Sequence, residues 1–352
     1  MDTEFLKLRE RVLVARAERI PLQLQGARTK DFYGESSVGE PLDLSGYRGI
    51  IDYEPSELVI TARCGTRLSD IETALAQAGQ FLAFEPPRFG GDPTLGGVIA
   101  AGLSGPRRIQ AGAARDFVLG VTLLASDGEL LRFGGQVMKN VAGFDVSRLV
   151  CGSLGILGII TQASIKVLPQ PRAEETLRLE MPGRDAIDAF NRWAGQPLPI
   201  SGAAWHEGAA WVRLSGAAAA VQAARAVIGG DRVFPVLARQ WWDSLRHYTH
   251  PVYSDSQVWR VSLPATAPPL QLPVEPLIDW GGALRWYSGD LQAVDVRELA
   301  STAGGTAMRW RGAGPGSRFH PLPPAIVQIH RRLKRSFDPE GIFNPGRLLP
   351  DM

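Results

Sequence analysis

The stretch "DPTLGGVIAAGLSG", from Asp92 to Gly105, gathers small residues in one place. Glycines and alanines recur along it, and Thr94 stands before the pair Gly96-Gly97, where its hydroxyl is suited to begin a short helix. Glycine allows the backbone to approach another group closely. Backbone N–H groups in a tight loop or at a helix start form a partly positive nest for anions. Two interpretations follow: backbone packed on backbone without a ligand, or a cradle for a phosphate group.

A second loop of the same kind, "QGARTKDFYG" (25–34), leaves the short strand "PLQLQ". Neither loop is a common nucleotide motif. The P-loop pattern G-x-x-x-x-G-K-[ST] does not occur, and no strand leads into G-x-G-x-x-G with an acidic residue about 20 positions later. Gly152, Gly155 and Gly158 are spaced differently. The sequence therefore speaks against a P-loop or a Rossmann dinucleotide site.

Composition limits the remaining classes of function. The 352 residues suffice for two or three domains, and 45% hydrophobic with 21% charged residues is typical of a globular protein. A net charge of +2 does not favour nucleic acid as a partner. Cys64 and Cys151 lie far apart, so we expect no metal or iron–sulfur cluster held by this chain alone.

The sequence shows no targeting or membrane-spanning segment of its own. Asp2 and Glu4 interrupt the N-terminal stretch, and the longest apolar run, "LVCGSLGILGII", is too short to cross a bilayer. We expect a cytoplasmic protein, or one held peripherally at the inner membrane by partner subunits.

The expected fold class is α+β, in three segments. Prolines and rising charge in "PQPRAEETLRL" indicate a boundary, which gives domains at 1–171 and 172–310 and a C-terminal segment at 311–352. "FVLGVTLLASDGELLRFGG" predicts a hairpin that turns at Asp127-Gly128.

Apolar spacing predicts two helices. The first covers 68–78, with Thr66 as its cap. The second, near the C-terminus, has one apolar face made of Ile326, Ile329, Leu333 and Phe337.

The order of several pieces resembles the vanillyl-alcohol-oxidase-type FAD proteins, which carry a PCMH-type FAD-binding domain. These pieces are "QGARTKDF", "DPTLGGVIAAGLSG", "GAARDFVLGVTLLASDGELL", "MKNVAGFDVSRLVCGSLGILGIITQASIKVLP" and "FDPEGIFNPGRL". The fourth, with Lys139-Asn140, Gly143, Asp145 and Gly152-Ser153, is the most specific, and it follows the D-lactate and glycolate dehydrogenase branch. Within that branch the chain is similar to FAD-binding subunits of bacterial glycolate oxidases.

The resemblance implies FAD bound between two α+β subdomains, with an α+β cap domain over the flavin and a helical tail that returns to it. The residues it assigns to FAD are Gly26, Ala27, Arg28, Thr29 and Lys30 in the first pyrophosphate loop, Thr94, Leu95, Gly96, Gly97, Ala101 and Gly102 in the second, then Asp116, Val118, Gly155, Gly158, Ile159 and Asn344. Tethered relatives use a histidine in the first loop or a cysteine in the second. This chain has neither there, so we expect FAD to be non-covalent.

The sequence departs from relatives that oxidise 2-hydroxy acids by themselves, because the G-D-G-N-x-H-type cluster of the cap is missing. Its five histidines are scattered, so no catalytic base is assigned; His320 remains one residue that the C-terminal segment could bring to the flavin. Arg260 and Arg285, each near a tryptophan, are candidates for holding a substrate carboxylate or for a protein interface.

Three hypotheses remain open. The first is an FAD-binding, electron-transferring subunit of a multi-subunit glycolate oxidase, with a second flavoprotein subunit and an iron–sulfur subunit as partners. The second is a stand-alone FAD-dependent 2-hydroxy-acid dehydrogenase. The third is an assembly module that contains flavin and performs no catalysis.

Overall fold

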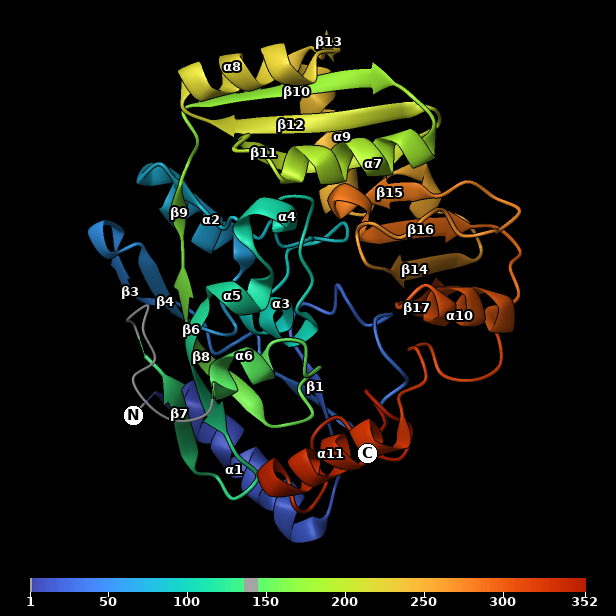
Figure 1. Cartoon of the computed structure of the whole chain (residues 1–352). Helices are drawn as coiled ribbons and strands as arrows, with labels where there is room; N and C mark the ends of the chain where they lie inside the picture. The colour runs from blue at the N-terminus through green and yellow to red at the C-terminus, as the bar shows by residue number, and fades with distance from the viewer. Residues whose placement is uncertain (1, 136–144) are drawn as a thin grey trace.

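Two antiparallel sheets, one in each half of the chain, organise the fold in this computed structural model, which describes residues 2–135 and 145–352 (Figure 1). The first sheet has the strand order β3-β4-β8-β6-β7, and the second has the order β13-β10-β12-β11-β15-β16-β14-β17. The α+β fold class is thereby confirmed. The chain passes from one sheet to the other between Pro169, the end of β9, and Ala173, the start of β10.

The five-stranded sheet is built from β3 (Ile50–Glu54), β4 (Val59–Arg63), β6 (Val118–Leu124), β7 (Leu130–Gly134) and β8 (Ile159–Lys166). β6 and β8 are almost wholly buried, as expected for central strands rich in Val, Ile and Leu. β6 and β7 pair up to Leu124 opposite Leu130, with Gly128 at φ +80° between them, so the predicted hairpin is confirmed.

The helices of the first half lie around this sheet or between it and the second half. They are α1 (Thr3–Glu18), α2 (Leu68–Gln77), α3 (Leu95–Ala101), α4 (Arg108–Ala111), α5 (Ala114–Phe117) and α6 (Val146–Val150). Two strand pairs complete this half: β1 (Leu22–Gln25) with β2 (Glu40–Asp43), which are parallel, and β5 (Gln80–Phe81) with β9 (Leu168–Pro169).

The cap of Thr66 on α2 was a wrong prediction. The helix begins after Arg67 without a side-chain cap, because the Thr66 hydroxyl bonds to both backbone groups of Gly49 instead. The side chain thus ties the loop after β4 to the loop before β3.

The eight-stranded sheet combines β10 (Ala173–Glu180), β11 (Ile200–His206), β12 (Ala209–Gly216), β13 (Asp231–Arg232), β14 (Val258–Ser262), β15 (Leu277–Asp279), β16 (Leu284–Ser288) and β17 (Thr306–Arg311). Its helices are α7 (Gly183–Ala194), α8 (Ala218–Ile228), α9 (Pro235–Arg246) and α10 (Ala293–Thr302). The amphipathic pattern of α7 explains its position, because Ile187, Phe190 and Trp193 are buried against this sheet.

A buried ion cluster joins the two halves. The Glu85 carboxylate accepts from the backbone N–H of Arg107 at 2.7 Å and pairs with Nη2 of Arg213 on β12 at 2.9 Å. Arg107 in turn pairs with Glu174 on β10 at 2.7 Å. Since buried charges are tolerated only when they are paired, these contacts fix the second half in one position over the first.

The C-terminal helix α11 (Pro324–Phe337) returns the chain to the first half (Figure 1). Phe343 then forms a parallel bridge with Leu22 of β1, and Ile342 and Phe343 are buried in the core beside α1. The predicted apolar face of α11 is not a buried face, because Ile326 is 39% and Ile329 56% exposed. The buried residue of this helix is Lys334, whose Nζ donates to the carbonyls of Ile156 and Phe343 and to Asp338.

Candidate functional site: a loop-built pocket in the first half

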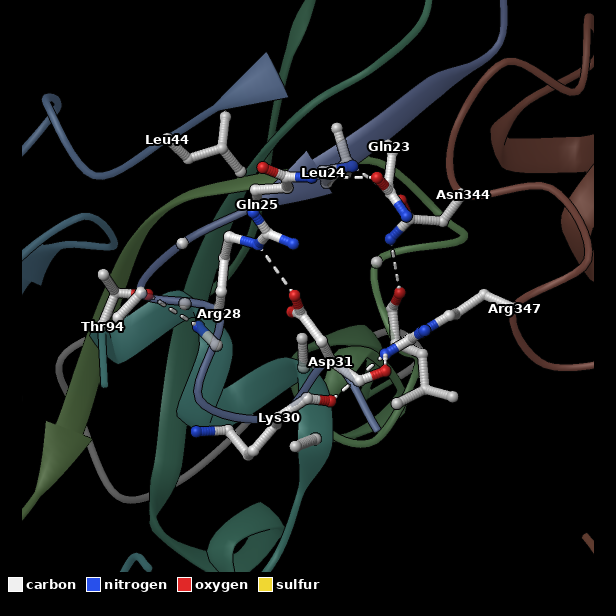
Figure 2. Close-up of a pocket in the computed structure, with 18 of the residues that line it drawn as sticks. Gln23, Leu24, Gln25, Arg28, Lys30, Asp31, Leu44, Thr94, Asn344 and Arg347 are labelled. Carbon is white, nitrogen blue, oxygen red and sulfur yellow. Dashed lines mark hydrogen bonds and ion pairs between the residues drawn. The ribbon is translucent and has the colours of Figure 1, made fainter. Parts of the chain in front are cut away.

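A pocket of about 400 Å³ lies where four loop segments meet (Figure 2). The walls come from 23–37, from 93–101, from 154–160 and from Asn344 and Arg347 near the C-terminus. Such a volume is within the range of small-molecule and cofactor sites.

The first loop presents a run of unpaired backbone donors. Within the described residues, none accepts a hydrogen bond from the N–H groups of Gly26 to Lys30, although Leu44 N donates to the Gln25 carbonyl immediately before them. Arg28 adopts left-handed backbone, with φ +58°. Left-handed conformation in a non-glycine residue costs free energy, and Arg28 is one of ten such residues in the described part of the chain. The loop is therefore shaped as a nest for an anion.

Side chains hold this loop in place from the solvent side. Nε of Arg28 donates to the Asp31 carboxylate at 2.8 Å, and Nη2 of Arg347 donates to the carbonyls of Lys30 at 3.2 Å and Asp31 at 2.9 Å. Figure 2 shows both contacts as dashed lines.

The second loop shapes the wall of the pocket but offers few free backbone N–H donors to a ligand. Thr94 caps α3, as predicted, with Oγ1 accepting from Gly97 N at 3.3 Å. The N–H groups of Leu95 and Gly96 donate to the carbonyls of Thr66 and Cys64. These backbone groups are thus already engaged by the protein itself.

The two adjacent glycines of α3 have different reasons to be glycine. A Cβ on Gly96 would lie 2.9 Å from the Cβ of Cys64, so this residue is needed for packing. A Cβ on Gly97 would meet only Oγ1 of Thr94, at 3.2 Å, and Gly97 lines the pocket. Backbone packing therefore accounts for Gly96, while Gly97 leaves open space at the pocket wall.

Asn344 ties three segments of the wall together. Its Oδ1 accepts from Leu24 N and its Nδ2 donates to the Leu154 carbonyl, each at 2.7 Å, while its backbone N donates to the Leu22 carbonyl at 2.9 Å. Gly155 is required beside it, because a Cβ there would lie 2.8 Å from Nδ2 of Asn344. Asn344 thus positions the wall of the pocket.

The polar groups of the lining suit an anionic ligand. Burial lowers the pKa of Lys30 to about 8, and its Nζ donates to Oγ1 of Thr29 at 3.0 Å, with no ion pair inside the described residues. Oγ of Ser37 is buried and has no hydrogen-bond partner in the described part of the chain. Burial also raises the pKa of the Cys64 thiol, which keeps it protonated.

Most of the predicted cofactor residues line this pocket: Gly26, Ala27, Arg28, Thr29, Lys30, Thr94, Gly96, Gly97, Ala101, Gly155, Gly158 and Asn344. Five do not line it: Leu95, Val118 and Ile159 are core residues, Gly102 ends α3, and exposed Asp116 accepts from Ala113 N. Predicted Lys139, Asn140 and Gly143 fall outside the described residues.

Sequence reasoning missed several lining residues, chiefly Ser37, Cys64 and Arg347. Arg347 follows Asn344 closely in "FNPGRL", and that proximity was an available signal. Ser37 and Cys64 have no motif around them and reach the pocket only through the fold.

Aromatic rings fill the space between the pocket and the eight-stranded sheet. Tyr33 lines the pocket, and its ring centroid lies 5.5 Å from that of Trp310. The ring of Tyr248 stacks on both Trp310 and Phe89, with 4.9 Å to each centroid, and these two rings are 6.1 Å apart. Among the described residues the lining includes no histidine.

The remaining candidates lie in the second half. His320 is held by Ala307 N and is close to Ser301, away from the pocket lining. Arg285 is fully buried and donates to the carbonyls of Gly282, Ala267 and Pro268, so its guanidinium anchors a loop. Arg260 is half-buried, with its guanidinium over the ring of Trp280 at 5.3 Å. Among the described residues, no group of three or more His, Cys, Asp or Glu is arranged to hold a metal ion.

None of the described helices has the length and apolarity needed to cross a membrane.

Comparison with known proteins gives one family match and several relatives. Residues 6–134 match the FAD binding domain family. The glycolate oxidase subunit GlcE of Escherichia coli (strain K12) is 47% identical over 346 residues, which cover 98% of this chain and 97% of that subunit. The glycolate oxidase subunit GlcD of Bacillus subtilis (strain 168) is 32% identical over 45% of this chain and 34% of its own.

More distant proteins support the same fold. A D-lactate dehydrogenase of Archaeoglobus fulgidus is 25% identical, over 95% of this chain and 87% of the relative. A solved structure of alkyldihydroxyacetonephosphate synthase superposes with a TM-score of 0.67 at 15% identity, covering 96% of this chain and 74% of that one. At 15% identity this likeness shows a shared fold and nothing about function.

Proposed function

The chain belongs to the family of FAD-binding glycolate oxidase subunits, and from this premise we propose that it is the FAD-binding subunit of a multi-subunit oxidase that converts glycolate to glyoxylate. Bound FAD would supply the redox chemistry, and the chain would bind it, orient it and shield it from water. The observation that carries the proposal is the nest at Gly26 to Lys30, where five consecutive N–H groups have no acceptor within the described residues.

The pocket fits the cofactor in its donor set. The pyrophosphate is assigned to the N–H groups of the first loop, with Lys30 adding positive charge. Gly97 leaves the space that a side chain would take, and the unpartnered Ser37 hydroxyl is available to a polar edge of the ligand. The other predicted residues, including Asp116 and Val118, remain assigned by resemblance only.

We propose that substrate oxidation needs partner subunits, namely a second flavoprotein and an iron–sulfur protein. Removing a proton from a 2-hydroxy acid requires a placed base, and the described lining of this pocket has no histidine. Aromatic rings occupy the space toward the eight-stranded sheet. The domain division at 1–171, 172–310 and 311–352, and peripheral attachment at the inner membrane through partners, belong to the same proposal.

The test compares the isolated chain with the reconstituted complex. FAD-saturated chain is assayed with glycolate and with D-lactate and a dye acceptor, and we expect little turnover until both partners are added. Robust turnover by the chain alone would favour the stand-alone dehydrogenase. A colourless protein that binds no FAD in titration would refute the proposal itself.

A further inference from the structure

Arg347 anchors the first loop at the end of its run of free N–H groups (Figure 2). Its Nη2 donates to the carbonyls of Lys30 at 3.2 Å and Asp31 at 2.9 Å, and its Nη1 donates to the Glu35 carbonyl at 3.0 Å. The contact is reciprocal, because Glu35 N donates to the Arg347 carbonyl at 3.0 Å. One guanidinium thus holds three carbonyls of the loop.

The free N–H groups of Gly26 to Lys30 therefore lie between two fixed points. Leu44 N donates to the Gln25 carbonyl at 2.8 Å just before them, and Arg347 holds two carbonyls at their end. Because the carbonyl and the N–H of a trans peptide point in opposite directions, a fixed carbonyl also fixes the direction of the next N–H group. A loop that is fixed before its ligand arrives loses less conformational entropy on binding.

The positive charge of Arg347 has no direct acidic partner. Among the described residues it forms no ion pair, although two acids are close to it in the same loop. Asp31 pairs instead with Arg28 at 2.8 Å, and the Glu35 carboxylate accepts from the backbone N–H of Arg318 at 2.6 Å. The half-buried guanidinium binds carbonyls and lines the pocket, so its charge is available to an anion there.

The cations of the described lining differ in what they can offer an anion. The side chain of Arg28 is 64% exposed and is engaged by Asp31. Lys30 has a pKa lowered by burial to about 8, so it loses its charge in mildly alkaline solution. Arg347 keeps its proton at any working pH, as arginines do. It combines a lasting charge with a fixed position.

We propose that Arg347 is a positioning residue for the FAD pyrophosphate, which holds the loop with its free N–H groups toward the phosphates and attracts them with its unpaired charge. A planar guanidinium suits this task, because its donors reach several acceptors at once, whereas an ammonium is a single point. The role rests on the proposed function and deepens it, since cofactor affinity would depend on a residue 317 positions after Lys30.

Two substitutions separate the contacts from the charge. Arg347→Gln removes the charge and keeps an amide donor, while Arg347→Lys keeps the charge and loses the planar set of donors. FAD binding to the full chain is titrated by flavin fluorescence at increasing sodium chloride concentrations. Both variants should bind FAD roughly tenfold more weakly, because each loses hydrogen bonds of a charged donor. Only Arg347→Gln should also show a flatter salt dependence, because salt screens an attraction that this variant lacks.

Arg331→Gln is the matched control. Arg331 lies on α11 and pairs with Asp351 in the same C-terminal segment, but it does not line the pocket. This variant should bind FAD with the affinity and the salt dependence of the wild type. Urea unfolding of each FAD-free protein shows whether it is folded, so that weaker FAD binding by a folded variant reports on the pocket.

A measurement that leaves Arg347 in place complements these variants. In Lys30→Met the lysine charge is gone, and FAD affinity should still fall with added salt because the Arg347 charge remains. Loss of all salt dependence in Lys30→Met would overturn the proposed role of Arg347.

Two further results would overturn it: wild-type FAD affinity in Arg347→Gln, or weaker binding with the salt dependence of the wild type, which a purely structural role would produce. A wild-type chain that binds no FAD would refute the proposed function itself, whereas FAD binding that the Arg347 substitutions leave unchanged would refute this role alone.

Discussion

Substituting Gly97 by valine should separate cofactor binding from folding. Because a Cβ at Gly97 meets only Oγ1 of Thr94, at 3.2 Å, the free protein should keep nearly its full stability. The two further methyl groups would intrude on the pocket that Gly97 lines. Overpacking of this kind costs about 1–3 kcal/mol. Because the clash arises only when FAD is bound, FAD should bind roughly 5- to 150-fold more weakly.

The adjacent residue provides the control. In Gly96→Ala the new Cβ would lie 2.9 Å from the Cβ and 3.1 Å from the carbonyl oxygen of Cys64, inside the fold. This variant should lose about 1–3 kcal/mol in its free energy of unfolding, measured in urea without FAD. FAD affinity of both proteins is measured by flavin fluorescence titration. If Gly97→Val binds FAD like the wild type, or if both variants lose equal stability, the assignment of Gly97 to the cofactor is refuted.

Three further predictions follow from individual residues. Lys334→Met should destabilise the fold by about 3–5 kcal/mol in urea unfolding, because it removes the cation paired with the buried Asp338 carboxylate and the donor to two carbonyls. A loss below about 1 kcal/mol would contradict this. FAD affinity should fall as the pH rises through about 8, where Lys30 loses its proton, and Lys30→Met should lack this dependence in titrations across that range. The folding stability of the FAD-free protein should change with pH in the opposite direction, because the folded protein buries the Lys30 cation and holds its pKa below that of the unfolded chain. The free energy of unfolding, measured relative to Lys30→Met, should therefore rise as the pH increases from about 8 to 10.5. Acid precipitation should release all flavin to the supernatant, since the Cys64 thiol beside the pocket is held protonated by burial; colour in the pellet would indicate a covalent link.

Local sequence patterns were enough to locate the two glycine-rich loops, but they could not tell which contact each residue of the loops makes. Thr94 was recognisable as a cap because its role is local, and the structure confirms it. Thr66 looked equally suitable, yet its hydroxyl is used by Gly49 from a distant loop, which no local pattern reveals. The same limit applies to Gly96 and Gly97, which look alike in the sequence and differ only in what the fold places beside them.

The C-terminal helix α11 shows that apolar spacing alone does not identify the buried face of a helix. Its apolar spacing predicted a buried face at Ile326 and Ile329, but the helix buries Lys334 and leaves both isoleucines exposed. A lysine in that position is stable only because three acceptors from separate segments converge on its Nζ. Arg260 and Arg285 were likewise equivalent in the sequence, while the fold satisfies one with carbonyls and leaves the other under-used.

The hydrogen bonds of Asn344 to Leu24 and Leu154 can form only late in the synthesis of the chain. The bond to Leu24 joins the β1 strand to a residue 320 positions later, and Arg347 closes the first loop from a similar separation. On the ribosome, β1 and both glycine-rich loops emerge long before these two side chains exist, so the wall they complete remains open during most of translation. We therefore expect cofactor loading to be a late step, completed only after the end of the chain has folded back, and a nascent chain stalled before residue 344 should hold flavin poorly.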